Sequence, residues 1–97
     1  HNISGELTKE LLAPGDGVAV SQLTITNIHD TNSCAVDLYI EKKLTGKFHL
    51  LKNSELNKGE TLIYDKIRFS NAANEFGLYI KLTKSASETP AVDVIIS

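Results

Sequence analysis

Tryptophan and methionine are absent from this 97-residue chain, and cysteine occurs once, as Cys34. One cysteine cannot form an intramolecular disulfide, so the chain is not one of the small disulfide-stapled scaffolds of secreted proteins. Three tyrosines and three phenylalanines are few for a sugar-binding surface built on exposed aromatic rings. The chain is 41% hydrophobic and 23% charged, which is ordinary globular composition and predicts one domain over residues 1–97.

The chain also lacks an excess of charge and a long apolar run. Ten Lys and Arg face twelve Asp and Glu, for a formal charge of −2, and Arg68 is the one arginine. This balance argues against a nucleic-acid partner, and no apolar run approaches the roughly 20 residues of a membrane span. The chain opens with His1, and we interpret residues 1–4 as a tag remnant or a disordered arm.

The clearest strand signal runs from Cys34 to Glu41. Apolar and mostly polar residues alternate over these eight positions, as in a strand with one buried face. Cys34, Val36, Leu38 and Ile40 are expected in the core, and Ala35, Asp37, Tyr39 and Glu41 on the outer face.

The segment 18–28 also alternates, but its apolar positions change parity. Val18 and Val20 share one face, whereas Leu23 and Ile25 share the other. Side chains alternate with period two along a strand, so a uniform strand cannot bury both pairs. We expect a β-bulge near Ser21 and Gln22 that resets the parity; partial cover on both faces is the alternative.

Further short strands are predicted at intervals of 8–12 residues, separated by polar and glycine-containing turns, and no helix is convincing. This spacing is typical of an antiparallel β-sandwich, and we predict an all-β, jelly-roll-like fold of about eight short strands. The remaining predicted strands are 6–13, 47–51, 61–64, 67–69, 76–83 and 92–96, with 52–58 and 85–90 as turns.

No catalytic, metal or cofactor site is predicted. His1, His29 and His49 form no ligand motif, and the loop aspartates lack the spacing of a calcium site. Cys34 with His29 or His49 is the only nucleophile–base pair to consider. Because Cys34 begins the apolar face of its strand, we interpret it as a buried core thiol. We therefore expect a protein that is not an enzyme.

The outer strand faces are the predicted functional surface. Tyr39, Tyr64 and Tyr79 all fall on outward parity, where tyrosines serve as interface contacts or as a platform for a sugar. We favour an interface made by Asp37, Tyr39, Glu41 and Tyr79. Carbohydrate binding is the alternative.

The order of these signals resembles small all-β virion structural proteins of marine tailed bacteriophages, over residues 6–84. The chain departs from that pattern at 69–75, where the family's usual Gly-Asp turn is missing. The segments that carry the resemblance are the turn at Pro14–Gly17, LTITN at Leu23–Asn27, VDLYI at Val36–Ile40, the strand Lys47–Leu51 and LNKGETL at Leu56–Leu62.

The resemblance implies a non-enzymatic tail, fibre or capsid-decoration subunit located in the virion. Its partners would be copies of itself, as a trimer or larger ring, and other virion proteins. The runner-up is a carbohydrate- or surface-binding β-sandwich module, whose contacts would come from loops at one end.

Overall fold

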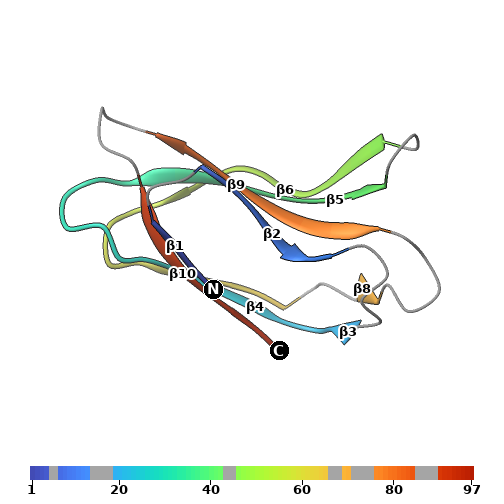
Figure 1. The fold of residues 1–97 in the computed structure, drawn as a ribbon. Helices are drawn as coiled ribbons and strands as arrows, with labels where there is room; N and C mark the ends of the chain where they lie inside the picture. Colours follow the sequence, from blue (N-terminus) through green and yellow to red (C-terminus); the bar gives the residue numbers. More distant parts are fainter. Residues whose placement is uncertain (5–6, 14–18, 43–45, 66–68, 71–75, 85–89) are drawn as a thin grey trace.

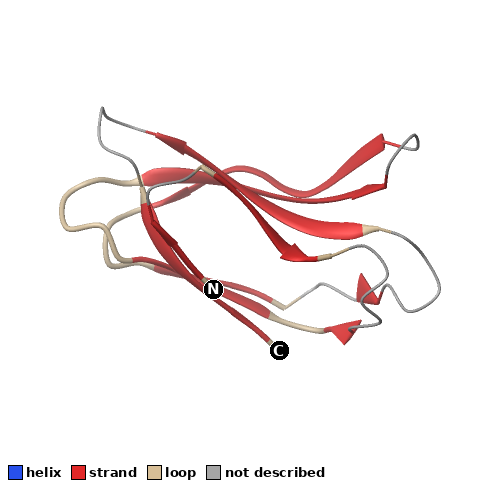
Figure 2. Cartoon of the chain, in the orientation of Figure 1, coloured by secondary structure: helices blue, strands red, loops and turns tan. Residues whose placement is uncertain are grey.

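The computed structural model describes residues 1–4, 7–13, 19–42, 46–65, 69–70, 76–84 and 90–97, with the backbone alone at 69–70. The described ranges fold as strands and loops, and they hold no helix long and apolar enough to cross a membrane (Figure 2). The strands are β1 (Asn2–Ser4), β2 (Thr8–Leu12), β3 (Ala19–Val20), β4 (Leu23–Asn27), β5 (Cys34–Lys42), β6 (Gly46–Leu56), β7 (Thr61–Tyr64), β8 (Phe69–Ser70), β9 (Gly77–Lys84) and β10 (Ala91–Ile96).

Two antiparallel four-stranded sheets pack face to face (Figure 1). Sheet A has the order β1-β10-β4-β7, sheet B has the order β2-β9-β5-β6, and β3 and β8 form a separate short ribbon. If the ribbon is set aside and the other eight strands are numbered along the chain, the two orders become 1-8-3-6 and 2-7-4-5. This is the strand order of a jelly roll. The predicted all-β, jelly-roll-like sandwich is confirmed.

The core lies between the sheets and is made by alternate residues of each strand. β9 buries Leu78, Ile80 and Leu82, and its neighbour β5 buries Cys34, Val36 and Leu38, as the alternation of both strands predicts. Val36 pairs with Leu82 and Leu38 with Ile80. Sheet A supplies the other wall of this aliphatic core. Its fully or almost fully buried side chains are Ile3, Leu23, Ile25, Val92 and Val94.

The parity of segment 18–28 does reset at Ser21 and Gln22, but not through a bulge. Val20 ends β3, which pairs with β8, whereas β4 begins at Leu23 inside sheet A. Between the two strands, the amides of Ser21 and Gln22 both donate to the Ser97 carbonyl, at 2.9 and 3.0 Å. Val20 and Leu23 are therefore buried in two different strands with different partners. The chain changes parity where one strand ends and the next begins, so no bulge is needed. Val18 lies outside the described residues.

β6 is longer than predicted, since it continues through most of the expected turn at 52–58 and ends at Leu56. Asn53 takes a left-handed conformation, with φ of 53°, and the register with β5 shifts between Val36 and Leu38. The extra residue lets polar side chains continue along the strand while Leu56 reaches the core opposite Cys34. β2 and β7 lie where they were predicted, and Glu6, Ile67, Arg68 and 85–89 lie outside the described residues.

Residues 1–4 are not a disordered arm. Asn2–Ser4 forms β1 at the edge of sheet A, paired with β10, and Ile3 is completely buried. The Asn2 amide donates to the Asp93 carboxylate at 2.7 Å, and the terminal amine of His1 donates to the Val94 carbonyl at 2.6 Å. The polar–apolar–polar pattern of this triplet suits an edge strand, but three residues are too few to predict one.

Asn27, at the end of β4, is the completely buried polar residue that joins the two sheets. Its side-chain amide donates to the carbonyl of Leu56 at the end of β6 and to the carbonyl of Asn32, both at 3.0 Å. Its side-chain oxygen accepts from the amide of His29 at 2.9 Å. The junction therefore depends on an amide group, because a carboxylate could not donate and an apolar residue could do neither.

The backbone of Asn27 is equally engaged, with the turn before β7. Its amide donates to the Glu60 carbonyl at 3.0 Å, and its carbonyl accepts from the Gly59 amide at 2.9 Å. Gly59 has a φ of 72°, which glycine adopts without strain. The segments Leu23–Asn27 and Leu56–Leu62, distant in sequence, thus meet at one point.

We predict that Asn27→Ala lowers the free energy of unfolding by about 2–4 kcal/mol, because it removes the three hydrogen bonds made by a completely buried side chain. Urea denaturation of purified protein measures the change. Asn57→Ala, at an exposed position in the neighbouring turn, is the matched control and should cost less than about 1 kcal/mol. Equal losses in the two variants would contradict the assigned role of Asn27.

Candidate functional site

The outer face of sheet B carries an aromatic row that crosses its strands. Glu10 of β2 pairs with Tyr79 of β9, Tyr79 with Tyr39 of β5, and Tyr39 with His49 of β6. The Tyr39 and Tyr79 rings stack with centroids 5.5 Å apart, and the His49 ring lies 5.5 Å from Tyr39 on the other side. This placement outside the core confirms the predicted outward parity of Tyr39 and Tyr79. The same prediction is wrong for Tyr64, which pairs with the buried Leu23 and packs against the core.

Tyr39 is nevertheless covered by its own chain. The Lys47 ammonium lies 4.5 Å from the centre of its ring, a cation–π contact, and the residue is only 5% exposed. Burial, helped by the charges of Glu41 and Asp37, raises the pKa of the Tyr39 hydroxyl. Tyr39 therefore offers little free ring surface to a partner or a sugar.

Asp37 is the second covered residue of this face, with 5% exposure. Its carboxylate accepts from the Asn53 amide at 2.7 Å, and the ammonium of Lys52 and the Nε2 of His49 lie 3.7 and 3.8 Å away. The left-handed turn at Asn53 aims that backbone amide at the carboxylate. Asp37 thus holds the irregular part of β6 against β5.

Glu41 and Tyr79, the other two residues of the predicted interface, lie half-buried on the same face. Tyr79 leans over Gly77, since a Cβ built on Gly77 would lie 2.7 Å from the Tyr79 hydroxyl. Burial raises the pKa of the Tyr79 hydroxyl, and the charge of Glu10 and a hydrogen bond with it add to the rise. The structure therefore brings the four predicted residues onto one face, where their own chain covers two of them.

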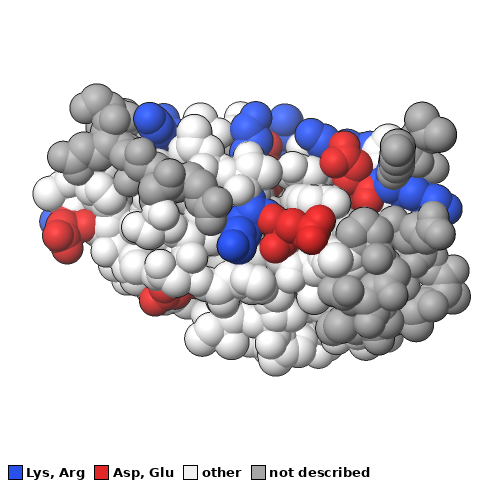
Figure 3. Space-filling view, in the orientation of Figure 1, with Lys and Arg blue, Asp and Glu red and all other residues white. Residues whose placement is uncertain are grey.

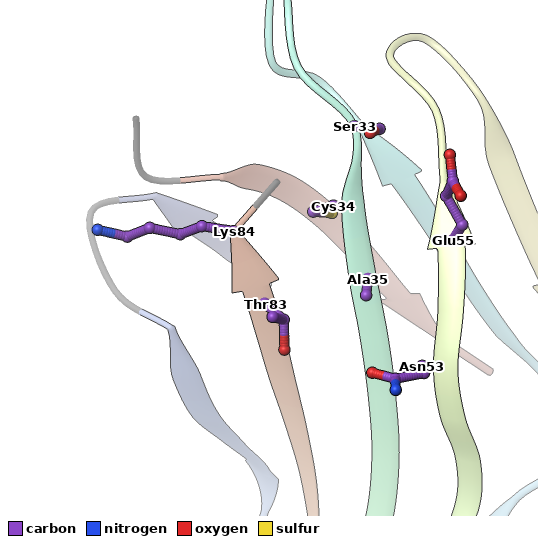
Figure 4. Close-up of a pocket in the computed structure, with 7 residues that line it drawn as sticks. All are labelled: Ser33, Cys34, Ala35, Asn53, Glu55, Thr83 and Lys84. Carbon is purple, nitrogen blue, oxygen red and sulfur yellow. The ribbon is translucent and has the colours of Figure 1, made fainter. Parts of the chain in front are cut away.

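A shallow depression of about 390 Å³ lies at the end of the same face (Figure 4). Ala35 of β5 forms its low floor, between Asn53 and Glu55 of β6 and Thr83 of β9. Ser33, Cys34 and Lys84 complete the lining. Its side chains supply hydroxyl, amide and carboxylate groups that can bond a small polar ligand.

The reactive side chains considered from the sequence are engaged in the fold. Cys34 is 1% exposed, and burial raises the pKa of its thiol, which confirms the predicted core cysteine. His29 accepts the amides of Thr31 and Asn32 on its Nδ1, at 3.2 and 3.1 Å. Among the described residues, no group of three His, Cys, Asp or Glu side chains is placed to hold a metal ion.

The outer face of sheet A is of the opposite character. Its four strands, β1, β10, β4 and β7, contain one charged residue, Asp93. The side-chain amide of Asn2 donates a hydrogen bond to the Asp93 carboxylate. The charged side chains gather over sheet B, in the upper part of Figure 3, while the surface over sheet A is mostly uncharged. The charged residues in the strands of sheet B are Lys9, Glu10, Asp37, Glu41, Lys42, Lys47, Lys52, Glu55, Lys81 and Lys84.

Three large isoleucines are exposed on this mostly uncharged face. Ile28, Ile63 and Ile95 are 42%, 59% and 64% exposed. Ile95 of β10 and Ile63 of β7 flank Thr24 of β4 in one row across the strands. We call this surface, made by Thr24, Thr26, Ile28, Thr61, Ile63 and Ile95, the isoleucine face.

Sequence reasoning missed the isoleucine face although one signal was present. Ile63 and Ile95 lie on the parity opposite to the core positions Leu62, Val94 and Ile96, so each could be predicted as an exposed isoleucine. Their alignment on either side of Thr24 depends on the pairing of β10 and β7 with β4.

No protein-family model and no curated protein sequence matches this chain.

We predict that Tyr79→Phe makes the protein less sensitive to alkali. The raised pKa means that, above the ordinary tyrosine value of 10.0, the unfolded chain loses this proton more readily than the native one. Stability therefore falls as pH rises through this range. Urea denaturation at pH 9 and 11 should show a smaller loss for Tyr79→Phe than for wild type. A loss as steep as that of wild type would contradict the assignment.

Proposed function

We infer that this protein is a non-enzymatic structural subunit that acts by association with other proteins or with itself. The observation that carries this proposal is the isoleucine face, on which Ile63 and Ile95 are 59% and 64% exposed. Asp93 is the one charged residue within the four strands of sheet A. Apolar patches of this kind on small soluble domains commonly mark interaction sites. Association would remove the isoleucines from water.

The use of the polar side chains supports a structural role. Asn27 and Asp37 bond backbone groups of β6, His29 bonds backbone groups of its own loop, and Cys34 lies in the core. Each of these groups stabilises the fold by its contacts. A role in assembly requires none of them to react.

We propose a virus particle as the setting. The sequence resembles small virion proteins of marine tailed phages, and the jelly roll is a frequent architecture of viral capsid subunits. Two of the segments that carry the resemblance, Leu23–Asn27 and Leu56–Leu62, contact each other through hydrogen bonds of Asn27 with Leu56 and Gly59. This contact gives both segments a structural role in the fold. In this setting the subunit would be a tail, fibre or decoration protein.

We predict that wild-type protein increases in mass with concentration, and that Ile63→Lys with Ile95→Lys keeps it monomeric, because burying an unpaired ammonium opposes association. Sedimentation velocity measures the mass. The control Thr83→Lys adds one lysine to the exposed outer face of sheet B and should associate like wild type. A wild-type chain that stays monomeric at millimolar concentration would contradict self-association.

Carbohydrate binding is the second candidate, favoured by the depression above Ala35. Its hydroxyl, amide and carboxylate groups match the donors and acceptors of a sugar, and it lies on the face that carries Tyr79. The absence of tryptophan and the cover over Tyr39 leave this candidate weaker than association.

If a glycan is bound, Thr83→Val and Glu55→Ala should each weaken binding by about threefold to tenfold, since each removes a side-chain group that can hydrogen-bond a sugar hydroxyl at this exposed site. A glycan array followed by calorimetry measures this, with Thr61→Val on the isoleucine face as control. Failure of any glycan to bind, or equal binding by all variants, would exclude this candidate.

A further inference from the structure

We propose that the isoleucine face binds a second copy of this chain, and that the two copies stack sheet A on sheet A about a two-fold axis parallel to β4. This inference rests on the proposed role in association and adds the partner and the geometry. It differs from the trimer or larger ring expected from the sequence, because a two-fold contact uses the same surface on both copies.

The first argument is the charge of the face. Two copies of a surface rich in lysine or in carboxylates would repel one another, whereas the four strands of sheet A contain one charged residue, Asp93. Thr24, Thr26 and Thr61 present hydroxyl groups, which both donate and accept hydrogen bonds. The Thr26 and Thr61 hydroxyls bond each other at 3.0 Å with either as donor, so one of the two keeps its proton for a partner. Such groups can therefore pair with their own copies, and the face is chemically complementary to itself.

The second argument is the order of residues across the strands. Ile95, Thr24 and Ile63 form a row over β10, β4 and β7, with Thr24 in the middle. A two-fold axis along β4, lying between the stacked sheets, exchanges the sides of this row. Ile95 then faces the partner subunit's Ile63, and Thr24 faces the partner subunit's Thr24.

The same axis places the charged residue favourably. Asp93 lies on β10 in the next row, with Thr26 of β4 and Thr61 of β7. Exchange of the two sides sets the Asp93 carboxylate opposite the partner subunit's Thr61, a hydroxyl donor, and away from the partner subunit's Asp93. Ile28, which continues β4 through its bond to the Ala91 carbonyl, faces the partner subunit's Ile28.

The size of the face sets the strength of this contact. Four strands about 4.8 Å apart, with about 3.3 Å per residue, give a footprint of roughly 400 Å² per copy. That is about half of the roughly 800 Å² per partner in a standard stable interface. The dimer is therefore dissociable in dilute solution, and the chain keeps a complete core of its own when alone.

Cysteine cross-linking tests the geometry. Thr24→Cys in a Cys34→Ala background is treated with a bis-maleimide whose reach matches the roughly 10 Å between stacked sheets. We expect a cross-linked dimer at least about tenfold faster than for Thr83→Cys in the same background, and loss of that excess when Ile95→Lys is added. Thermal unfolding of each variant confirms that the chain is folded.

A mixture of Ile95→Cys and Ile63→Cys chains tests the direction of the axis. Position 95 of one chain should cross-link to position 63 of the other faster than either position cross-links to itself. Homodimers in excess would overturn the axis along β4.

The outcomes separate this inference from the proposed function. If wild type associates and Ile95→Lys abolishes association, but Thr24→Cys reacts no faster than Thr83→Cys, the stacked dimer is wrong and association through the isoleucine face stands. If wild type is monomeric at every concentration, the second copy is excluded as the occupant and self-association is wrong as well.

Discussion

The apolar contact between the inner faces of sheets A and B is the interaction on which the rest of the structure depends. Each fully buried Leu, Ile or Val contributes roughly 1.5–3 kcal/mol relative to exposure, and side chains from β4 and β10 meet those of β5 and β9 there. Because side chains alternate along a strand, this contact also decides which residues face outward. The charged surface of sheet B and the isoleucine face of sheet A are both consequences of it.

Polar side chains then fix where the strands end and how the sheets are joined. Asn27, at the end of a strand of sheet A, bonds the Leu56 carbonyl of sheet B and backbone groups of the turn before β7. Asp37 fixes the irregular part of β6 through the Asn53 amide. A polar group that is buried without partners is costly, so these residues specify one arrangement of loops. The outer faces of the two sheets differ because most charged residues lie in the strands of sheet B, while the strands of sheet A expose isoleucines to solvent.

The strands of highest regularity were predictable from sequence, and the isoleucine face was not. Alternation alone places Leu78, Ile80 and Leu82 in the core and Tyr39 outside it. It cannot show that the Lys47 ammonium covers Tyr39, because that contact depends on the register of β6 against β5. The length of β6 was missed for a related reason: a left-handed Asn53 lets a polar segment remain in the sheet.

By itself, the sequence determined the all-β class, the buried thiol of Cys34 and the faces of β5 and β9, since these follow from local alternation. Tertiary structure alone decided which strands became neighbours. It incorporated Asn2–Ser4 as a strand of sheet A, since Ile3 finds a place in the core only beside β10. It also set Ile95 and Ile63 on either side of Thr24, because strands from distant parts of the chain pair with β4. A surface made by three separate strands exists only after they pair.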